Sequence, residues 1–406
     1  MNQRRFVQIH ALTSYPAALL NRDDVGFAKR IPFGGVTRTR ISSQCLKRHW
    51  RTFDGEQSIN SLPGTAPSVR SRVTFERSVY AKLVEQGTDA NIARAVTAAL
   101  MAEVLGESAK AKKEKAEIRE QQGVESLATG QITVLGRPEI EFLLAEARTI
   151  CQAVADPAKA GEQVRKHFTK ERRENLRTLK RGGGLDAALF GRMVTSDILA
   201  RCDAAIHVAH AFTVHAEATE SDYFSAVDDL LRTGDDAELG SGHIGTTELT
   251  SGLYYSYVVV DLPLLVSNLE ACEQEDWATS DRTLAAQLLE RVIHLIATVS
   301  PGAKLGSTAP HAYAHLVLVE CSSAQPRTLA NAFLAPVKER PDVVANAYRA
   351  LANHVGELDA MYGSTERQVA AIGPKDALHP ALPPNTHAAN LHSLAQWAAN
   401  HVRGQA

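Results

Sequence analysis

Cysteine is scarce in this chain of 406 residues. The five cysteines lie far apart, and no two of them form a C-x-x-C pair. This spacing excludes a zinc ribbon and disfavours a disulfide framework, so we expect a reducing compartment. No apolar run approaches the roughly 18 residues that a transmembrane helix needs, and no cleavage site follows the Arg4-Arg5 pair. We therefore expect a soluble, cytoplasmic protein that has no membrane partner.

Motifs for catalysis are also missing. The segment PGAKLGST, residues 301–308, lacks the G-x-x-x-x-G-K-[ST] pattern of a phosphate loop, and no serine lies in a G-x-S-x-G motif. Three histidines lie close together in sequence, but on one strand His207 and His215 would face away from His210. We therefore expect no metal and no cofactor, and we find no constellation typical of a small-molecule enzyme.

Acidic residues are rare in the first 51 residues. This stretch contains ten Lys or Arg against Asp23 and Asp24, a net charge of +8, although the net charge of the whole chain is -2. The rest of the chain therefore has a net charge of -10. Because the positive charge is concentrated, its local potential would steer a polyanion to this segment.

The most concentrated basic stretch is RTRISSQCLKRHWR, residues 38–51, which has no acid from Ile41 onward. Ser42 or Ser43 is suited to cap a helix, and the positive end of the helix dipole attracts anions. Exposed helices usually mix acids and bases, so this pattern predicts an anion-binding helix. On such a helix, Lys47 and Arg51 lie four residues apart on one face. The polar residues Gln44, Arg48 and Arg51 form an adjoining row.

A second basic stretch is VRKHFTKERRENLRTLKR, residues 164–181, in which Glu171 and Glu174 are the only acids. As one helix it would carry cations on nearly every side. Such a stretch is often a solvated face, and its charge is equally suited to touch nucleic acid, so both interpretations stay open. Four cations gather in its first half: Arg165, Lys166, Lys170 and Arg173.

The order of the expected elements indicates an α+β fold. Short runs that are rich in β-branched and aromatic residues predict strands, and amphipathic runs predict helices. The resulting β-α-β-β-α-β order is the ferredoxin-like plan of RNA-recognition modules. The expected elements are strands at 6–12, 204–215, 252–262 and 314–320, and helices at 43–52 and 280–300.

Two segments interrupt this plan. Residues 60–185 are rich in alanine and charge with helical spacing, which predicts a helical insertion, and 109–123 could be an exposed helix or a mobile loop. Residues 217–251 are too long for a hairpin turn and too polar for a core, which predicts a projecting arm. Adjacent acids on this arm, Asp228-Asp229 and Asp235-Asp236, could bind Mg²⁺ for a nuclease, although such acids are more often solvated.

Several strings in this chain resemble the CasC-type backbone subunit of type I-E CRISPR Cascade complexes, a member of the CT1975-like family. They occur in the family's order from residue 6 to about 335. The strings are NRDDVGFAKRIPFGGVTRTRISSQCLKRHWR, GRMVTSD, HVAHAFTVH, DYFSAVDDL, HIGTTELTSGLYYSYVVVDL and PGAK.

The resemblance implies a hand-shaped subunit. It implies an RNA-recognition-like (ferredoxin-like) palm, a helical finger domain, a β-hairpin thumb and a helical C-terminal tail. The implied boundaries are 1–59, 186–216 and 252–340 for the palm, 60–185 for the finger, 217–251 for the thumb and 341–406 for the tail.

The resemblance also implies a function. Copies of the subunit would oligomerise along CRISPR guide RNA, together with other Cascade subunits, and present the guide for pairing with target DNA in antiviral defence. The subunit would not be an enzyme; the alternative is a metal-dependent nuclease that uses the acids of the thumb. The RNA contacts would be Arg22, Lys29, Arg38, Arg40, Ser43, Gln44, Lys47, Arg48, Arg51 and Met193; the thumb wedge Tyr223 and Phe224; and the DNA contacts Arg165, Lys166, Lys170 and Arg173.

Overall fold

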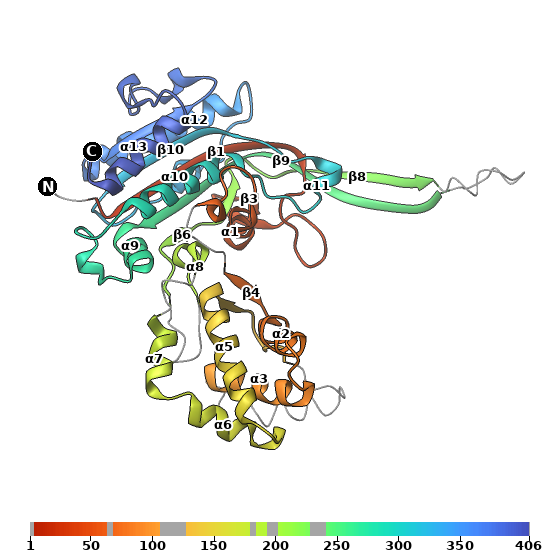
Figure 1. Cartoon of the computed structure of the whole chain (residues 1–406). Coiled ribbons are helices and arrows are strands. Elements are labelled where there is room, and N and C mark those ends of the chain that lie inside the picture. Colours follow the sequence, from red (N-terminus) through yellow and green to blue (C-terminus); the bar gives the residue numbers. More distant parts are fainter. Residues whose placement is uncertain are drawn as a thin grey trace, which may run out of the picture. The chain divides into compact units, whose positions relative to one another are not determined.

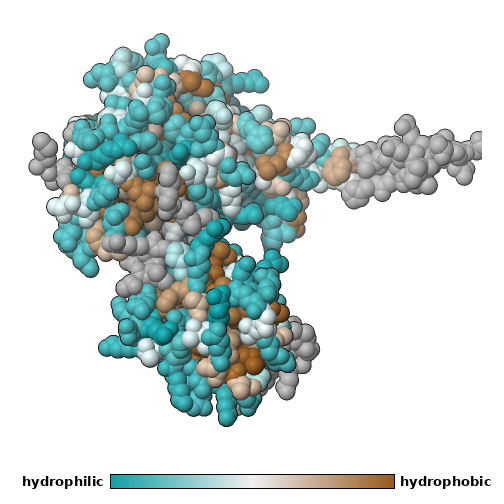
Figure 2. All heavy atoms as spheres, in the orientation of Figure 1, coloured by the Kyte–Doolittle hydropathy of each residue, from teal (hydrophilic) through white to brown (hydrophobic). Residues whose placement is uncertain are grey.

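The structure, a computed structural model, divides into two compact units. Unit 1 comprises residues 1–58, 207–262 and 282–406, and unit 2 comprises 59–206 and 263–281. The residues that the structure describes are 4–62, 68–105, 127–178, 184–192, 202–227 and 241–405. Among them, no helix is both long and apolar enough to cross a membrane. On the face drawn in Figure 2, hydrophilic residues predominate and hydrophobic residues form small separate patches.

Unit 1 is built on one antiparallel sheet (Figure 1). The order along the sheet is β11-β10-β1-β9-β7-β3-β2, and β6 and β8 also pair with β9. The strands are β1 Phe6–Ala18, β2 Arg30–Phe33, β3 Val36–Ile41, β6 Ile206–Val208, β7 Ala211–Thr213, β8 Ala218–Val227, β9 Ser241–Asp261, β10 Ala314–Ser322 and β11 Glu366–Ala371. The helices are α1 Ser43–Thr52, α10 Thr283–Thr298, α11 Leu305–Thr308, α12 Val343–Tyr362 and α13 Leu391–Arg403.

The centre of this sheet has the predicted ferredoxin-like order. The central strands are β10-β1-β9-β7, α1 lies between β1 and β7 in the chain, and α10 lies between β9 and β10. All three pairings are antiparallel, as expected for a β-α-β-β-α-β unit. The predicted α+β fold is therefore confirmed. The expected strand at 204–215 is instead two short strands, β6 and β7, separated by residues 209 and 210.

Helices cover both faces of the sheet. Leu46 and Trp50 of α1 meet Thr13 and Tyr254 on the face that α10 also covers. On the opposite face, Leu12 belongs to a fully buried cluster with residues of α12 and of the segment 329–333. An RNA-recognition module binds RNA by stacking bases on an open sheet face. On the central strands of this sheet, helices cover both faces, so bases cannot stack there in that way.

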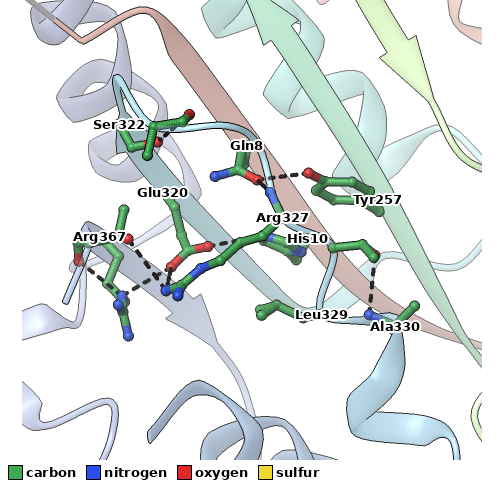
Figure 3. A network of polar contacts seen from close by, with 12 residues as sticks. Gln8, His10, Tyr257, Glu320, Ser322, Arg327, Leu329, Ala330 and Arg367 are labelled. Atoms are coloured by element: carbon green, nitrogen blue, oxygen red, sulfur yellow. Dashed lines mark hydrogen bonds and ion pairs between the residues drawn. The ribbon is translucent and has the colours of Figure 1, made fainter. Parts of the chain in front are cut away.

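A buried ionic network fastens α12 and β11 to the covered face (Figure 3). The carboxylate of Glu320 on β10 lies 3.2 Å from Arg367 of β11 and 3.5 Å from the ring of His10 on β1. Arg367 also binds Asp359 of α12 at 2.6 Å. Burial raises the pKa of Glu320, but His10 and the two guanidinium groups of Arg367 and Arg327 outweigh it and hold this pKa below its usual value. The carboxylate therefore stays charged, and these contacts anchor the C-terminal region.

The C-terminal region was expected to be a helical tail, and it contains more than helices. Residues 366–371 form β11, which pairs with β10 at the edge of the sheet. The tail is thus built into unit 1, since β11 extends the sheet and α13 packs on α10. The helical pattern of α12 and α13 was visible in the sequence, whereas six residues of edge strand left too short a signal.

Strands β8 and β9 form a long hairpin that extends beyond the rest of the sheet (Figure 1). Pairing runs from Ala218 opposite Ser251 to Val227 opposite Ser241. Exposed side chains dominate the outer part of β8, because residues 219–224 are all exposed. The predicted arm at 217–251 is therefore a β-hairpin over its described residues.

Unit 2 is mostly helical and has its own core. Buried apolar residues of α3, α5 and α6 form this core, together with Phe75 and Phe168. The elements are β4 Val69–Ser71, a π-helix Glu76–Tyr80, α2 Ala81–Glu85, α3 Ala90–Leu105, β5 Thr133–Leu135, α5 Arg137–Ala153, α6 Ala160–His167, α7 Lys170–Thr178, α8 Leu185–Phe190 and α9 Leu262–Glu270.

Unit 2 also includes two stretches that the sequence boundaries assigned to the palm, 186–206 and 263–281. The amide of Asn268 in α9 donates hydrogen bonds of 3.0 Å to the carbonyls of Ala188 and Asp203. These bonds join the two stretches to each other. A boundary set by motif order could not reveal this pairing of distant segments. The highly charged segment 109–123 lies outside the described residues.

Candidate nucleic-acid interface

Helix α1 begins where its sequence predicts, and its apolar side faces the sheet as expected. Ser42 is the N-cap, and its hydroxyl accepts a hydrogen bond of 3.2 Å from the backbone N–H of Cys45. Leu46 and Trp50, four residues apart, are buried against the sheet. Gln44 and Arg48 are exposed on the opposite side, and the helix has no acid in its first turn. The cations are therefore held at the surface by the packing of the apolar stripe.

The backbone donors at the start of α1 are largely occupied. The N–H of Ser42 donates to the side-chain oxygen of Asn21, and that of Ser43 donates to Nδ1 of His210, both at 2.9 Å. Since Nδ1 accepts this bond, the ring of His210 is neutral there. We had expected these backbone donors to hold an anion, but those of Ser42, Ser43 and Cys45 already have partners within the chain.

Three cations lie close enough to His210 to act on its charge. The imidazole has a pKa below its usual value of 6.5, first because of burial and then because of the charges of Arg40, Lys29 and Lys47. Burial raises the pKa of the Cys45 thiol, and Arg48 and Lys29 act in the opposite direction. Side chains from the loop before β2, from β3 and from α1 therefore share one region. We call Lys29, Arg40, Lys47 and Arg48 the α1 basic surface.

Acids form ion pairs with Arg30, which neighbours this surface, but with none of Lys29, Arg40 and Arg48 among the described residues. Arg30 of β2 forms ion pairs with Glu217 and with Glu248 on the hairpin, which raise its pKa. Within the described residues, no acid lies at ion-pair distance from Arg40 or from three further cations: Arg22, Lys29 and Arg48. Arg22 and Arg48 are exposed. Unneutralised cations of this density are suited to bind a phosphate backbone.

Arg38 is a correction to the predicted contacts. Its side chain is fully buried and donates hydrogen bonds to the carbonyls of Thr213 at 3.0 Å and Phe333 at 2.9 Å. Burial lowers the pKa of this guanidinium. The adjoining turn packs just as closely, since a Cβ on Gly34 would lie 1.6 Å from the carbonyl oxygen of Leu334. A guanidinium in this position supports the backbone and cannot reach a ligand outside.

The two aromatic residues of the hairpin have different surroundings. Tyr223 is 65% exposed and lies opposite Thr246. Phe224 points to the other face, where its ring covers Gly245 and the ammonium group of Lys304 lies 5.5 Å from the ring centre. Of the predicted wedge pair, Tyr223 is thus the residue with an accessible ring, whereas Phe224 already has partners.

The second basic stretch is not one helix. It divides into α6 and α7 at Phe168, whose ring is buried in the core of unit 2. The break separates Arg165 and Lys166 from the cations of α7. Several of these cations are paired, since Arg173 binds Glu103, Arg172 binds Glu146, and Lys166 binds Glu162 at 3.1 Å. The interpretation of this stretch as one helix was therefore wrong, and Arg165 and Lys170 are the exposed members of the predicted DNA contacts that have no ion pair among the described residues.

Some of the other predicted residues lie outside the described part of the chain, and one has described contacts. Met193 lies outside the described residues, and so do the acids of the arm, Asp228-Asp229 and Asp235-Asp236. His215 is buried, and its Nε2 accepts a hydrogen bond from the N–H of Leu253. No group of three or more metal-ligating side chains occurs among the residues that could be searched.

Sequence reasoning missed two partners of the basic surface. His210 was considered as a metal ligand, and it instead caps the first turn of α1. Glu248 was not singled out, although its carboxylate binds Arg30 and accepts the N–H of Ala28 at 2.9 Å. Both residues lie more than 160 positions from their partners. No local pattern could have shown these contacts.

Comparison with solved structures shows relatives of this fold. One chain, from a structure described as "CRISPR RNA-guided surveillance complex, pre-nicking", matches with 26% identity and a TM-score of 0.75, over 99% of this chain and 100% of that chain. Another, from a "CRISPR RNA-guided surveillance complex", has 23% identity and a TM-score of 0.66 over 97% and 99% of the two chains, which shows a shared fold. No curated protein matches the chain.

A family-level match covers nearly the whole sequence. Residues 7–398 match the family described as CT1975-like protein. The match extends beyond residue 335, where the recognised strings end, into the C-terminal region. The predicted relationship is thus confirmed, and this chain belongs to the family of CT1975-like proteins.

Proposed function

We propose that this chain is a non-catalytic, RNA-binding backbone subunit of a type I-E Cascade surveillance complex. Copies of it would line up along a CRISPR guide RNA, beside other Cascade subunits, and present the guide for pairing with target DNA. The family membership and the likeness to subunits of RNA-guided surveillance complexes support this role. The observation that carries the proposal is the α1 basic surface, in which Lys29, Arg40 and Arg48 have no acid at ion-pair distance among the described residues.

The chemistry of this surface suits a guide that must stay readable. Lys29, Arg40 and Arg48 offer charged donors to phosphate oxygens, which position a strand without reading its sequence. In RNA-guided systems the sequence is read by base pairing, and the protein holds the backbone. A surface that offers cations to phosphates therefore suits a scaffold that holds a strand.

The proposal extends to DNA through unit 2. Arg165 and Lys170 are exposed, and no acid among the described residues lies at ion-pair distance from either of them. They could contact the phosphates of DNA that flanks the target. Because neighbouring cations are paired with acids, we expect this contact to be weaker than the contact of the α1 basic surface with RNA.

Binding of unrelated single-stranded RNAs tests the proposed function. Lys47→Ala combined with Arg51→Ala should weaken binding similarly for every sequence. The slope of log K against log salt should fall by about 1.4, because each phosphate contact to a single strand contributes about 0.7. The matched control is Lys338→Ala with Lys375→Ala, which removes two exposed cations elsewhere in unit 1 and should leave the slope unchanged.

Two further results would overturn the proposal. If the purified protein retains no RNA and binds none of the tested strands, the RNA-binding role fails. If it cleaves RNA in Mg²⁺ and Asp228→Ala abolishes cleavage, the chain is the nuclease of the alternative hypothesis. A scaffold should instead copurify with RNA of uniform length and with other subunits.

A further inference from the structure

A short loop between β1 and β2, residues 22–28, has an unusually fixed backbone. One carboxylate oxygen of Asp23 accepts hydrogen bonds from the N–H groups of Val25 at 3.0 Å, Gly26 at 2.8 Å and Phe27 at 2.9 Å. The N–H of Asp23 donates to the carbonyl of Phe27 at 2.8 Å. Gly26 has a φ of 103°, which glycine adopts readily. The loop is therefore closed by its own hydrogen bonds.

This loop holds two apolar side chains in solvent. Val25 is 76% exposed and Phe27 is 49% exposed. Aromatic rings are usually well buried, and an exposed one on a fixed backbone loses little conformational entropy when a ligand covers it. The arrangement is suited to contact a flat apolar ligand.

The loop is anchored to the hairpin on the face that carries Tyr223. The N–H of Ala28 donates to Glu248 on β9. Side chains two residues apart on a strand share a face, so Glu248 shares its face with Thr246, which lies opposite Tyr223. Two residues along a strand span roughly 7 Å. An exposed aromatic of the hairpin and the anchor point of the apolar loop are thus neighbours on one face.

Cations lie at both ends of the loop. Arg22 is its first residue, and Lys29 follows it as part of the α1 basic surface, where its charge acts on His210. Asp24 is exposed and offers an acceptor to a ribose hydroxyl or a base amine. Proteins that bind single strands combine a cationic track for the phosphates with aromatic rings for the bases. Loop and surface together have this composition.

We propose that Phe27, with Val25 beside it, is a stacking site for an unpaired nucleobase of the bound RNA strand. The proposal rests on the proposed RNA-binding function and adds a base contact to its phosphate contacts. Stacking on a ring does not depend on base identity, so this site would hold a base without selecting the guide sequence. The hairpin face with Tyr223 would limit the same space.

Substitution of Phe27 with two strands as probes tests this site. The probes are single-stranded oligoadenylate and an abasic ribose-phosphate strand of equal length, titrated against the full chain. Phe27→Ala should weaken oligoadenylate binding about 5- to 150-fold, which corresponds to the 1–3 kcal/mol of one stacked base, and leave the abasic strand unaffected. Phe27→Tyr should restore binding. Tyr362→Ala, which removes an exposed aromatic from α12, is the matched control and should change neither affinity.

The outcomes separate this site from the proposed function. If the Phe27→Ala variant binds both strands like the unsubstituted protein, while Lys47→Ala with Arg51→Ala weakens both, the stacking site is wrong and the RNA-binding function stands. If the unsubstituted protein binds neither strand, both proposals fail. If Phe27→Ala leaves oligoadenylate binding intact and reduces self-association without RNA, measured by light scattering, the loop is a protein contact and the stacking site is overturned.

Discussion

The α1 basic surface and the α6–α7 segment both gather cations, but their cations have different neighbours. Around α1, the described residues place no acid at ion-pair distance from Arg40 or Arg48. In α7, Arg172 and Arg173 bind Glu146 and Glu103. An ion pair already made within the protein leaves less charge for a ligand, so Arg40 and Arg48 offer more charge to a ligand than Arg172 and Arg173 do.

The difference shows how distant residues decide the function of a basic stretch. Glu103 lies 70 positions before Arg173, on α3, and Glu146 lies 26 positions before Arg172, on α5. Both acids reach α7 because α3 and α5 pack in the same core. A charge count along the sequence treats the two stretches alike, whereas the fold neutralises one of them.

Charge reversal should give the largest difference between the two regions. Arg40→Glu with Arg48→Glu removes two charge-assisted contacts, so RNA affinity should fall by at least about 3 kcal/mol, roughly 150-fold. Arg165→Glu with Lys170→Glu, the same change in charge, should reduce RNA affinity by less than about tenfold. Fluorescence anisotropy with one labelled strand measures both. Equal losses in the two variants would show that the comparison is wrong.

Stability should separate two arginines that the sequence treats as equals. Arg38→Met leaves the buried carbonyls of Thr213 and Phe333 without donors, which should lower the free energy of unfolding by about 2–3 kcal/mol. Arg40→Met should change stability by less than about 0.5 kcal/mol and weaken RNA binding instead. Urea unfolding monitored by circular dichroism checks the first effect. A fully stable Arg38→Met protein would contradict the structural role of this side chain.

The sequence was sufficient for the elements whose signal is local. Ser42 followed by the buried pair Leu46 and Trp50 determines both the start and the orientation of α1. The apolar-rich runs of β1 and β10 likewise predict buried strands. Arg38 could not be assigned, because its burial depends on Phe333, 295 positions away. The exposed cations of α1 could be predicted, because their exposure follows from helical periodicity. The burial of Arg38 could not, because a segment distant in the sequence covers it.

Removal of an acid should make the second region resemble the first. Glu146 is largely buried and binds both His167 and Arg172. Glu146→Gln should release the charge of Arg172, lower the free energy of unfolding by about 1–2 kcal/mol and raise affinity for double-stranded DNA a few-fold. Glu162→Gln is the control, since its pair with Lys166 is exposed and should matter little. Differential scanning calorimetry and a DNA titration measure the two effects, and unchanged DNA binding would contradict the explanation.

The smallest effect should come from His210, where the cations of the first region crowd one ring. Its pKa in the folded protein is below 6.5, so below that pH the unfolded chain binds the proton more readily. The contribution of His210 to stability is therefore complete above about pH 6.5 and decreases as the pH falls through this value. His294 and His401, whose pKa values burial also lowers, add to the same slope.

His210→Gln isolates the contribution of this ring. The glutamine oxygen can still accept the N–H of Ser43 and does not titrate. Urea unfolding between pH 7.5 and 5.5 should therefore show a shallower loss of stability in the variant. Bound RNA adds negative charge beside the ring and favours its protonated form, so RNA binding should take up protons in the unsubstituted protein and fewer in the variant. Identical slopes and identical proton uptake would mean that the cations of α1 do not act on His210, and the convergence that distinguishes this region would be refuted.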